Sequence, residues 1–158
     1  MYQLILKFFV SFTAGLLINL YAQANPLFSY QWNKRLLILA TPESSQETFR
    51  KQLRIIDHNR EGILDRDIHI IRIIGDELSG TAKEYNTVKW GRILRSLHQL
   101  NTEKFTIVLI GKDGGEKARS NRPITFCNLF NLIDLMPMRR EEISERKRKV
   151  NCKTPKPY

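Results

Sequence analysis

A short apolar run, RLLILA at residues 35–40, constrains the fold of this chain more than any other stretch. It has the length of a strand and almost no alternation of apolar and polar residues, which is typical of a strand buried on both faces. A strand of this kind lies in a sheet that carries helices on both sides. The run therefore predicts an α/β domain.

Strand and helix patterns alternate along the next hundred residues. Residues 41–64 have apolar side chains at helical spacing behind Ser44-x-x-Glu47, the pattern of a capping box, and predict a first helix. Residues 67–74 are rich in isoleucine and predict a second strand, and the polar residues 75–86 predict a loop. Residues 87–100 place Trp90 and Leu94 on one stripe of a second helix, which Gly91 weakens a little.

The stretch IGKDGGEKARS at residues 110–120 follows a third predicted strand at residues 104–110. Asp113-Gly114 is a strong hairpin signal, because a tight turn between strands needs residues that accept positive φ. A phosphate-binding loop would need a G-x-x-x-x-G-K-[ST] spacing and a following helix. Residues 116–120 are instead of strand length, so the stretch predicts a turn between two strands.

A third helix is predicted after Thr125, its expected N-cap. Pro137 is expected to end or kink this helix, and a second, mostly exposed helix is expected to reach Lys149. The resulting order is β-α-β-α-β-β-α, the connectivity of a thioredoxin-like core with a mixed four-stranded sheet. In that arrangement the third strand runs antiparallel to the first.

Two motifs resemble the signature of the domain of unknown function 4174 family, which has relatives among vertebrate secreted proteins of the sushi-repeat and coiled-coil-domain-containing 80 types. The motifs are Lys112-Asp113-Gly114-Gly115 and Met136-Pro137-Met138-Arg139. The resemblance covers about residues 32–146. It implies a thioredoxin-like or peroxiredoxin-like fold whose biochemical activity is not established.

The first 24 residues are typical of a signal peptide. Lys7 precedes an apolar stretch, and Ala22-Gln23-Ala24 supplies the small residues that signal peptidase prefers. The alternative is an uncleaved anchor, but polar residues interrupt the stretch and it is short for a span of roughly 20 residues. We therefore expect a secreted or periplasmic protein with no transmembrane segment after processing, a thioredoxin-like domain at residues 30–138 and a basic helical or disordered tail at residues 139–158.

The position of a thioredoxin nucleophile carries no cysteine. That nucleophile follows the first strand at the start of the first helix, where the chain reads Thr41-Pro42-Glu43-Ser44-Ser45. A serine hydroxyl cannot perform thiol exchange. The loop before the third strand also lacks the proline that usually faces the thiol pair, so thioredoxin-type or peroxidase chemistry at these positions is not expected.

The two cysteines, Cys127 and Cys152, allow three interpretations. They can form one disulfide that holds the tail to the third helix, as often happens in exported proteins. They can instead be a buried free Cys127 and a solvated Cys152. In the third interpretation, the protein is a thiol-redox-linked enzyme that uses Cys127.

Other candidate sites have simpler explanations. His58, His69 and His98 belong to three separate elements, and a zinc or catalytic cluster would require them to converge. Asp65 and Asp67 are typical turn residues, and Ser44-Ser45 either cap the first helix or present backbone donors to an anion. The sequence predicts no cofactor and no metal.

The charge of the chain points to an anionic partner. The formal net charge is +10, and residues 139–158 hold eight basic and three acidic residues. Candidate anion-binding residues are Arg139, Arg140, Arg146, Lys147, Arg148 and Lys149. We therefore expect an exported, non-catalytic binding module whose tail meets an anionic polymer, a membrane surface or a partner protein. No motif for specific nucleic-acid recognition is present.

Overall fold

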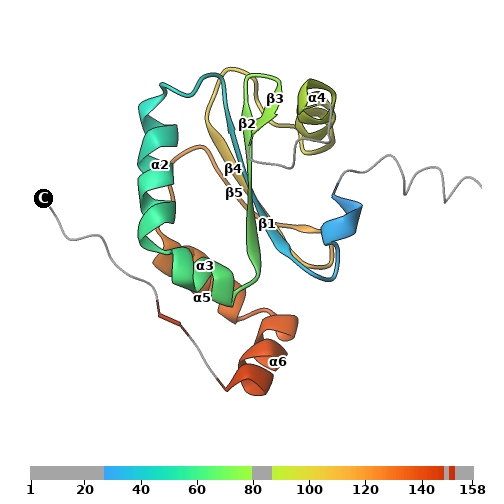
Figure 1. Ribbon diagram of the computed structural model, residues 1–158, viewed down its shortest axis with the longest axis vertical. Coiled ribbons are helices and arrows are strands. Elements are labelled where there is room, and N and C mark those ends of the chain that lie inside the picture. The colour runs from blue at the N-terminus through green and yellow to red at the C-terminus, as the bar shows by residue number, and fades with distance from the viewer. Residues whose placement is uncertain (1–26, 80–86, 148–149, 152–158) are drawn as a thin grey trace, which may run out of the picture.

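A five-stranded mixed sheet forms the centre of the protein in the computed structural model, which describes residues 27–79, 87–147 and 150–151 (Figure 1). The order across the sheet is β3-β2-β1-β4-β5. In chain order the strands are β1 (Arg35–Thr41), β2 (Ile68–Ile74), β3 (Glu77–Ser79), β4 (Thr106–Ile110) and β5 (Glu116–Ser120).

The pairing of β1 confirms part of the predicted topology. β1 runs parallel to β2 and antiparallel to β4, and β5 returns antiparallel to β4. The prediction of four strands was wrong, because β3 adds a fifth at the edge of the sheet within the expected loop. β3 is only three residues long and holds one apolar residue, Leu78, so it is too short to show a strand period.

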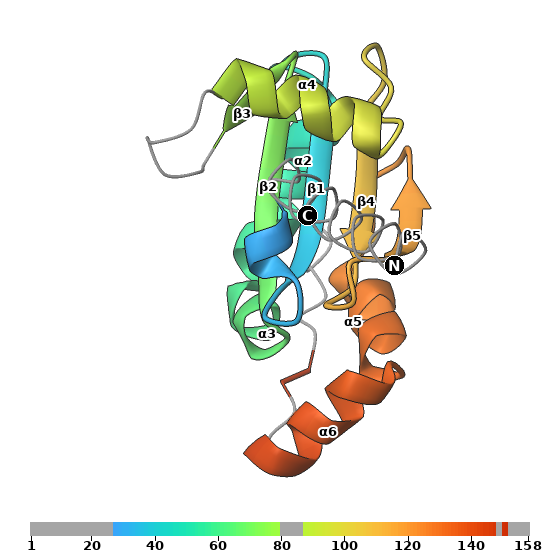
Figure 2. The ribbon, with the colours of Figure 1, turned by 90° about the vertical axis from the view of Figure 1, so that its right-hand side faces the viewer.

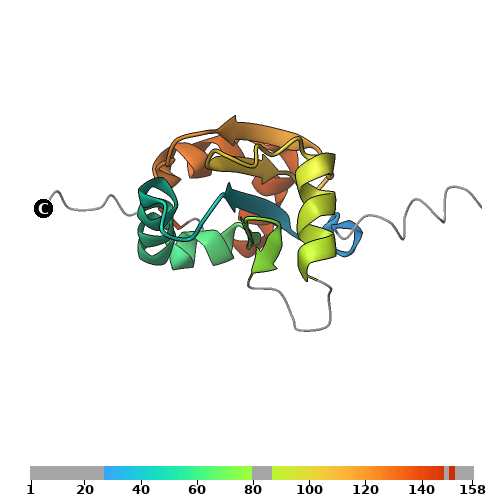
Figure 3. The ribbon, with the colours of Figure 1, turned by 90° about the horizontal axis from the view of Figure 1, so that it is seen from above.

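Helices cover both faces of this sheet (Figures 2 and 3). On one face lie α2 (Glu47–His58), α3 (Arg60–Asp65) and α5 (Phe126–Asp134), and on the other lie α4 (Thr87–Leu97) and the 3-10 turn η1 (Phe28–Tyr30). The last helix, α6 (Pro137–Arg146), lies beyond the end of the sheet at which β1 begins (Figure 2).

Alternate residues of β1 face the helices on the two sides of the sheet. Leu37 and Leu39 pack in the cluster with α2, α3 and α5, whereas Leu36 and Ile38 pack in the cluster with α4. Every residue of β1 is buried. This burial explains why the run at residues 35–40 lacks polar alternation.

The first predicted helix is two helices in the structure, α2 and α3, separated at Asn59. The predicted capping box was wrong, because Gln46 and not Ser44 is the N-cap of α2. The hydroxyl of Thr41 donates to Oε1 of Gln46 at 2.7 Å, and the backbone N–H of Gln46 donates to the carbonyl of Glu43. A turn therefore occupies the residues that were expected to form the first helical turn.

Pro137 ends the third predicted helix, as expected. α5 stops at Asp134, and α6 begins with Pro137 at its first position, where the missing N–H costs no helical hydrogen bond. α6 is less exposed than expected, since Arg139 and Glu142 are buried. The predicted boundary between domain and tail, at residues 138–139, falls inside this helix.

Candidate functional site

Ten ion-paired side chains gather at the end of the sheet where β1 begins, and we call them the charged cluster. They come from the start of β1, the α3–β2 connection, the β4–β5 turn, the end of α5 and α6. Six are cations and four are carboxylates: Lys34, Arg35, Arg66, Lys112, Arg139 and Arg146 with Asp65, Asp67, Asp134 and Glu142.

Glu142 of α6 connects the cluster to the sheet. Its carboxylate accepts hydrogen bonds from both terminal nitrogens of Arg35, at 3.1 and 3.0 Å, and lies 2.8 Å from Nζ of Lys112. The Arg35 side chain is 1% exposed and that of Glu142 is 11% exposed. Burial alone raises the pKa of Glu142, but the hydrogen bonds from Arg35 and Lys112 outweigh it and hold the pKa below its usual value.

Two further arginines tie α3, α5 and α6 together. Arg66 donates to both carboxylate oxygens of Asp134, at 3.0 and 2.7 Å, and its guanidinium stacks 3.9 Å from the centre of the Phe130 ring. Arg139 pairs with Asp65 and also donates to Asp134 at 3.2 Å. Because Arg66 and Arg139 are fully buried, their charges need these partners in order to be tolerated.

Asp67 is the carboxylate nearest to solvent at the edge of the cluster and faces three cations. Nζ of Lys112 lies at 2.9 Å, Nη2 of Arg146 at 2.7 Å and Nζ of Lys34 at 3.8 Å. Burial raises the pKa of Asp67, but hydrogen bonds from Lys112 and Arg146 lower it below the usual value. Asp67 also has a positive φ of 50°, which asparagine and aspartate tolerate better than most residues.

The β4–β5 turn confirms the hairpin prediction. The N–H of Gly111 donates to the carbonyl of Gly115 at 2.8 Å, and Gly114 has a φ of 82°. Oδ1 of Asp113 accepts from the N–H of Gly115 at 3.1 Å, while its other oxygen lies 2.6 Å from Nζ of Lys117. A strand follows this turn, so the stretch is not a phosphate-binding loop.

The two signature motifs meet across one pocket, which we call the motif pocket. Its volume is about 230 Å³. The start of α6 supplies two methionines and a proline, and the β4–β5 turn supplies the opposite wall. The lining residues are Arg35, Gly111, Lys112, Asp113, Lys117, Met136, Pro137 and Met138. Residues far apart in the sequence are thus brought together, and the side chains of Lys112 and Arg139 continue from the motifs into the charged cluster.

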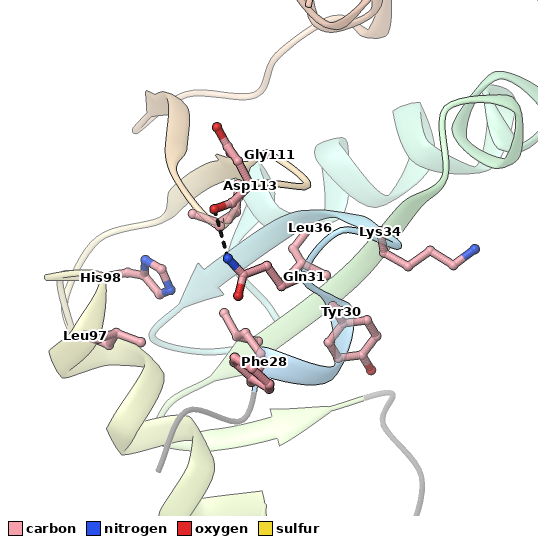
Figure 4. Close-up of a pocket in the computed structure, with 12 residues that line it drawn as sticks. Phe28, Tyr30, Gln31, Lys34, Leu36, Leu97, His98, Gly111 and Asp113 are labelled. Carbon is pink, nitrogen blue, oxygen red and sulfur yellow. Dashed lines mark hydrogen bonds between the residues drawn. The ribbon is translucent and has the colours of Figure 1, made fainter. Parts of the chain in front are cut away.

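A second pocket, of about 290 Å³, lies on the other side of the turn, between η1 and the end of α4 (Figure 4). Leu36 and Ile110 are buried among its lining residues, and Phe28 and Leu97 are 57% and 52% exposed. Nε2 of His98 is buried without a hydrogen-bond partner, and burial lowers the pKa of this histidine. The His98 ring therefore lines a pocket with both apolar and polar walls.

A family model matches residues 26–142 of the chain, and its description is "Domain of unknown function (DUF4174)". The chain belongs to the DUF4174 family. This DUF4174 domain includes both signature motifs and Glu142, through which α6 contacts Arg35.

Curated relatives of this DUF4174 chain are larger proteins. It is 24% identical over 136 residues to coiled-coil domain-containing protein 80 of Danio rerio, covering 76% of this chain and 16% of that protein. It is 25% identical over 133 residues to sushi repeat-containing protein SRPX2 of Homo sapiens, covering 82% and 29%. With sushi repeat-containing protein SRPX of Rattus norvegicus the identity is 32% over 113 residues, covering 70% and 24%. The chain therefore spans less than a third of each of these relatives. No solved structure matches it significantly.

The residues after β1 in this DUF4174 chain, which were compared above with the position of a thioredoxin nucleophile, carry hydroxyl and carboxylate groups. Thr41 is buried and its hydroxyl donates to Gln46, while Ser44 and Ser45 are exposed. Cys127 lies half-buried in the first turn of α5. Cys152 lies outside the described residues, so the disulfide stays a prediction.

The candidate tail residues of the DUF4174 chain separate into two groups. Arg139 is fully buried and Arg146 is ion-paired within the charged cluster, so neither is a free solvated cation. Arg140 and Lys147 are exposed. Arg148 and Lys149 lie outside the described residues, as do residues 152–158 of the tail and the predicted signal peptide.

The three histidines of the DUF4174 chain do not form a metal site. His69 stacks on Tyr30 with ring centres 4.8 Å apart, His98 follows α4, and His58 is the last residue of α2. Within residues 27–79, 87–147 and 150–151, no group of three or more metal-ligating side chains is placed to hold an ion. No helix in these ranges is long and apolar enough to cross a membrane.

Sequence reasoning missed most of the charged cluster of the DUF4174 domain. Arg35, Arg66, Asp134 and Glu142 were not among the candidate residues, and Asp65 and Asp67 were interpreted only as turn residues. One signal was available in the sequence. Arg35 opens a strand that is otherwise apolar, and a charge in such a place needs a buried partner. Nothing in the sequence identifies that partner as Glu142, which lies 107 residues away.

Proposed function

We propose that the chain is an exported, non-catalytic binding module with a thioredoxin-like fold, which contacts anionic envelope or matrix partners through its basic tail. The sheet order supports the fold proposal. With β3 set aside as an edge addition, the remaining strands have the order β2-β1-β4-β5, with β1 parallel to β2 and β4 antiparallel to both of its neighbours. This is the arrangement expected for the thioredoxin-like core described above.

The observation that carries the non-catalytic proposal is the position of the signature residues. The motif pocket and the charged cluster lie at the end of the sheet where β1 begins. The nucleophile of a thioredoxin would lie at the opposite end of β1, where Thr41 closes a hydrogen-bonded turn. The family-specific residues therefore surround a different place from the one that thiol chemistry would use.

The position of α6 supports a role for the tail. Arg139 and Glu142 fix this helix to the folded body. The backbone of Val150 is held there too, accepting from Arg66 at 2.9 Å and donating to Asp65 at 3.3 Å. Four more cations follow the helix, Arg148, Lys149, Lys153 and Lys156. Each contributes about 1 kcal/mol near an anionic surface, and the attraction decays within a Debye length of about 8 Å. Binding is therefore expected to be weak and sensitive to salt.

The test compares the chain from Asn25 to Tyr158 with a variant in which these four cations are replaced by glutamine. This variant keeps Cys152 and all of α6, whereas removal of residues 139–158 would leave Arg35 and Asp65 without their partners. The expected result is retention of the parent on heparin and on anionic vesicles at low salt, with most of it lost in the variant. Elution of both proteins at the same salt concentration would contradict the role of the tail.

Redox assays test the non-catalytic part. Insulin reduction and peroxide consumption by the chain from Asn25 to Tyr158 are expected to match buffer, because no thiol follows β1. Turnover that disappears in Cys127→Ser would instead establish the thiol-redox-linked enzyme. Intact-mass analysis of exported protein tests export, and the expected mass corresponds to a chain that begins near Asn25.

A further inference from the structure

The charged cluster contains more positive charge than it neutralises. Six cations share four carboxylates, so the cluster has a net charge of +2. In the interior of the cluster each buried arginine has a carboxylate partner. The side chains of Arg35, Arg66 and Arg139 are at most 1% exposed. The surplus therefore has to be balanced at the edge that faces solvent.

That edge lies around Asp67. The Asp67 side chain is 17% exposed and is ion-paired with three cations. Two of these, Lys34 and Arg146, have side chains that are 48% and 40% exposed. One carboxylate cannot neutralise Lys34, Lys112 and Arg146 together. An anion arriving from solvent can reach Lys34 and Arg146 without breaking any buried ion pair.

Arg146, one of the two exposed cations, is held in place before a ligand binds. It donates to the carbonyl of Asp65 and to the carboxylate of Asp67, both at 2.7 Å. The Lys34 side chain is held more loosely, with its Nζ 3.8 Å from the Asp67 carboxylate. Ordering of Arg146 has therefore already been completed on folding, which lowers the entropic cost of binding.

An exposed aromatic residue, Trp32, lies two positions before Lys34 in the chain. Trp32 is 62% exposed, and its backbone N–H donates to the carbonyl of Lys112 at 2.6 Å. Its φ of 66° is rare for a residue with a large side chain, and such conformations often occur at functional sites. An indole offers a flat apolar face together with a polar N–H, which suits a ligand with both apolar C–H surface and charged groups.

We propose that Lys34 and Arg146, beside Asp67, form an anion-binding site for a sulfated or carboxylated polysaccharide, with Trp32 available to its sugar rings. This inference rests on the proposed function and assigns part of the anion contact to the folded body. A lipid surface is a poorer match, because interfacial binding depends on a broad apolar face, and the site contributes one indole.

The test measures binding of a heparin hexasaccharide to the chain from Asn25 to Tyr158 by titration calorimetry at low salt. Each removed cation is expected to lower the affinity about fivefold. The double variant Lys34→Gln/Arg146→Gln is therefore expected to bind more than tenfold more weakly. Asp67→Asn, which suits the positive φ, is expected to bind more tightly than the parent because it removes the competing carboxylate.

The matched control is Lys51→Gln/Lys104→Gln, which removes two exposed cations from near the start of α2 and from just before β4, beside the end of β1 and not its beginning. It is expected to stay within twofold of the parent. Melting curves show whether each variant folds. If Arg146→Gln does not fold, Lys34→Gln alone tests the site. This variant is expected to fold, because Lys34 is exposed and its Nζ lies as far as 3.8 Å from the Asp67 carboxylate. Binding by the double variant within twofold of the parent, or weaker binding by folded Asp67→Asn, would overturn the site.

Two further outcomes separate this site from the tail. Loss of hexasaccharide binding only in the variant with four tail glutamines would overturn the inference and leave the proposed function standing. Binding of the parent to phosphatidylserine vesicles but not to the hexasaccharide would also overturn it. A parent that binds neither probe would overturn the proposed function as well.

Discussion

Glu142 is the residue through which the last helix is held to the sheet. Its carboxylate lies between Arg35 of β1 and Lys112 of the β4–β5 turn, and all three side chains are largely buried. A buried ion pair adds little to stability compared with a well-packed apolar pair, but loss of one partner leaves a charge with neither water nor a counter-ion. The cluster should therefore be sensitive to single substitutions.

We expect Glu142→Gln to lower the free energy of unfolding by about 3 kcal/mol, because it leaves the Arg35 and Lys112 charges without their shared carboxylate. Urea denaturation at neutral pH measures this change. Glu141→Gln, at the exposed neighbouring position, is the matched control and is expected to change the value by less than about 0.5 kcal/mol. Equal effects of the two substitutions would show that the Arg35–Glu142 pair contributes nothing specific.

Individual residues were predictable where their backbone conformation or composition is distinctive. Asp113 and Gly114 indicated the hairpin, and Pro137 indicated the helix end, because each restricts the backbone locally. Arg139 and Arg146 were interpreted as candidate anion-binding residues of a basic tail, and the structure places both in ion pairs. The charge of a side chain is visible in a sequence, whereas its burial depends on distant segments.

At the scale of elements, α4 approaches the edge of the sheet closely at Gly91. A Cβ atom built on Gly91 would overlap the carbonyl of Asp76, which precedes β3. The sequence showed Gly91 only as a weak point of a helix. In the structure it is the residue that lets α4 pack directly against the backbone beside β3, so its small size compensates for its poor helix propensity.

We expect Gly91→Ala to destabilise the protein by about 1–3 kcal/mol, although alanine is the better helix former, because the added methyl group forces α4 away from Asp76. Urea denaturation gives the free energy, and hydrogen exchange shows whether the change is concentrated in β3 and α4. Ser96→Ala, at an exposed position of the same helix, serves as the control and should be neutral or slightly stabilising. A stabilised Gly91→Ala would refute the close packing.

Long periodic elements were predictable and short ones were not. β1, β2, β4 and the helices α2, α4 and α5 all lie within the ranges that apolar patterns indicated, apart from the last residue of β1. β5 was predicted from the strand length of the polar run that follows the turn. β3 and the break at Asn59 were missed. Their positions depend on contacts with β2 and on the α2–α3 connection, which local composition does not encode.

At the scale of the whole molecule, half-buried imidazoles and ion-paired carboxylates divide the pH dependence of stability into two ranges. Burial lowers the pKa of His69 and His98, and for His69 the charge of Lys34 lowers it further. The pKa values of Asp67 and Glu142 also lie below their usual values. Protonation of the histidines therefore affects stability near neutral pH, and protonation of the carboxylates affects it only in more acidic solution.

We expect the free energy of unfolding to fall as the pH is lowered from 7.5 to 5. Over this range the unfolded histidines, with pKa values of about 6.5, bind protons before the folded ones do, so protonation favours unfolding. Urea denaturation at several pH values measures the trend. The double variant His69→Gln/His98→Gln should show a flatter dependence. Constant stability of the parent across this range would contradict the expected titration.

The distance along the chain between Arg35 and Glu142 has a consequence for the order of folding. These partners are 107 residues apart, so during synthesis Arg35 emerges long before its counter-ion. Desolvation of Arg35 without Glu142 is unfavourable, and a nascent chain that lacks α6 should keep the start of β1 hydrated. The start of β1 is then buried only when the last helix packs against it, which delays completion of folding until nearly the whole domain has been made.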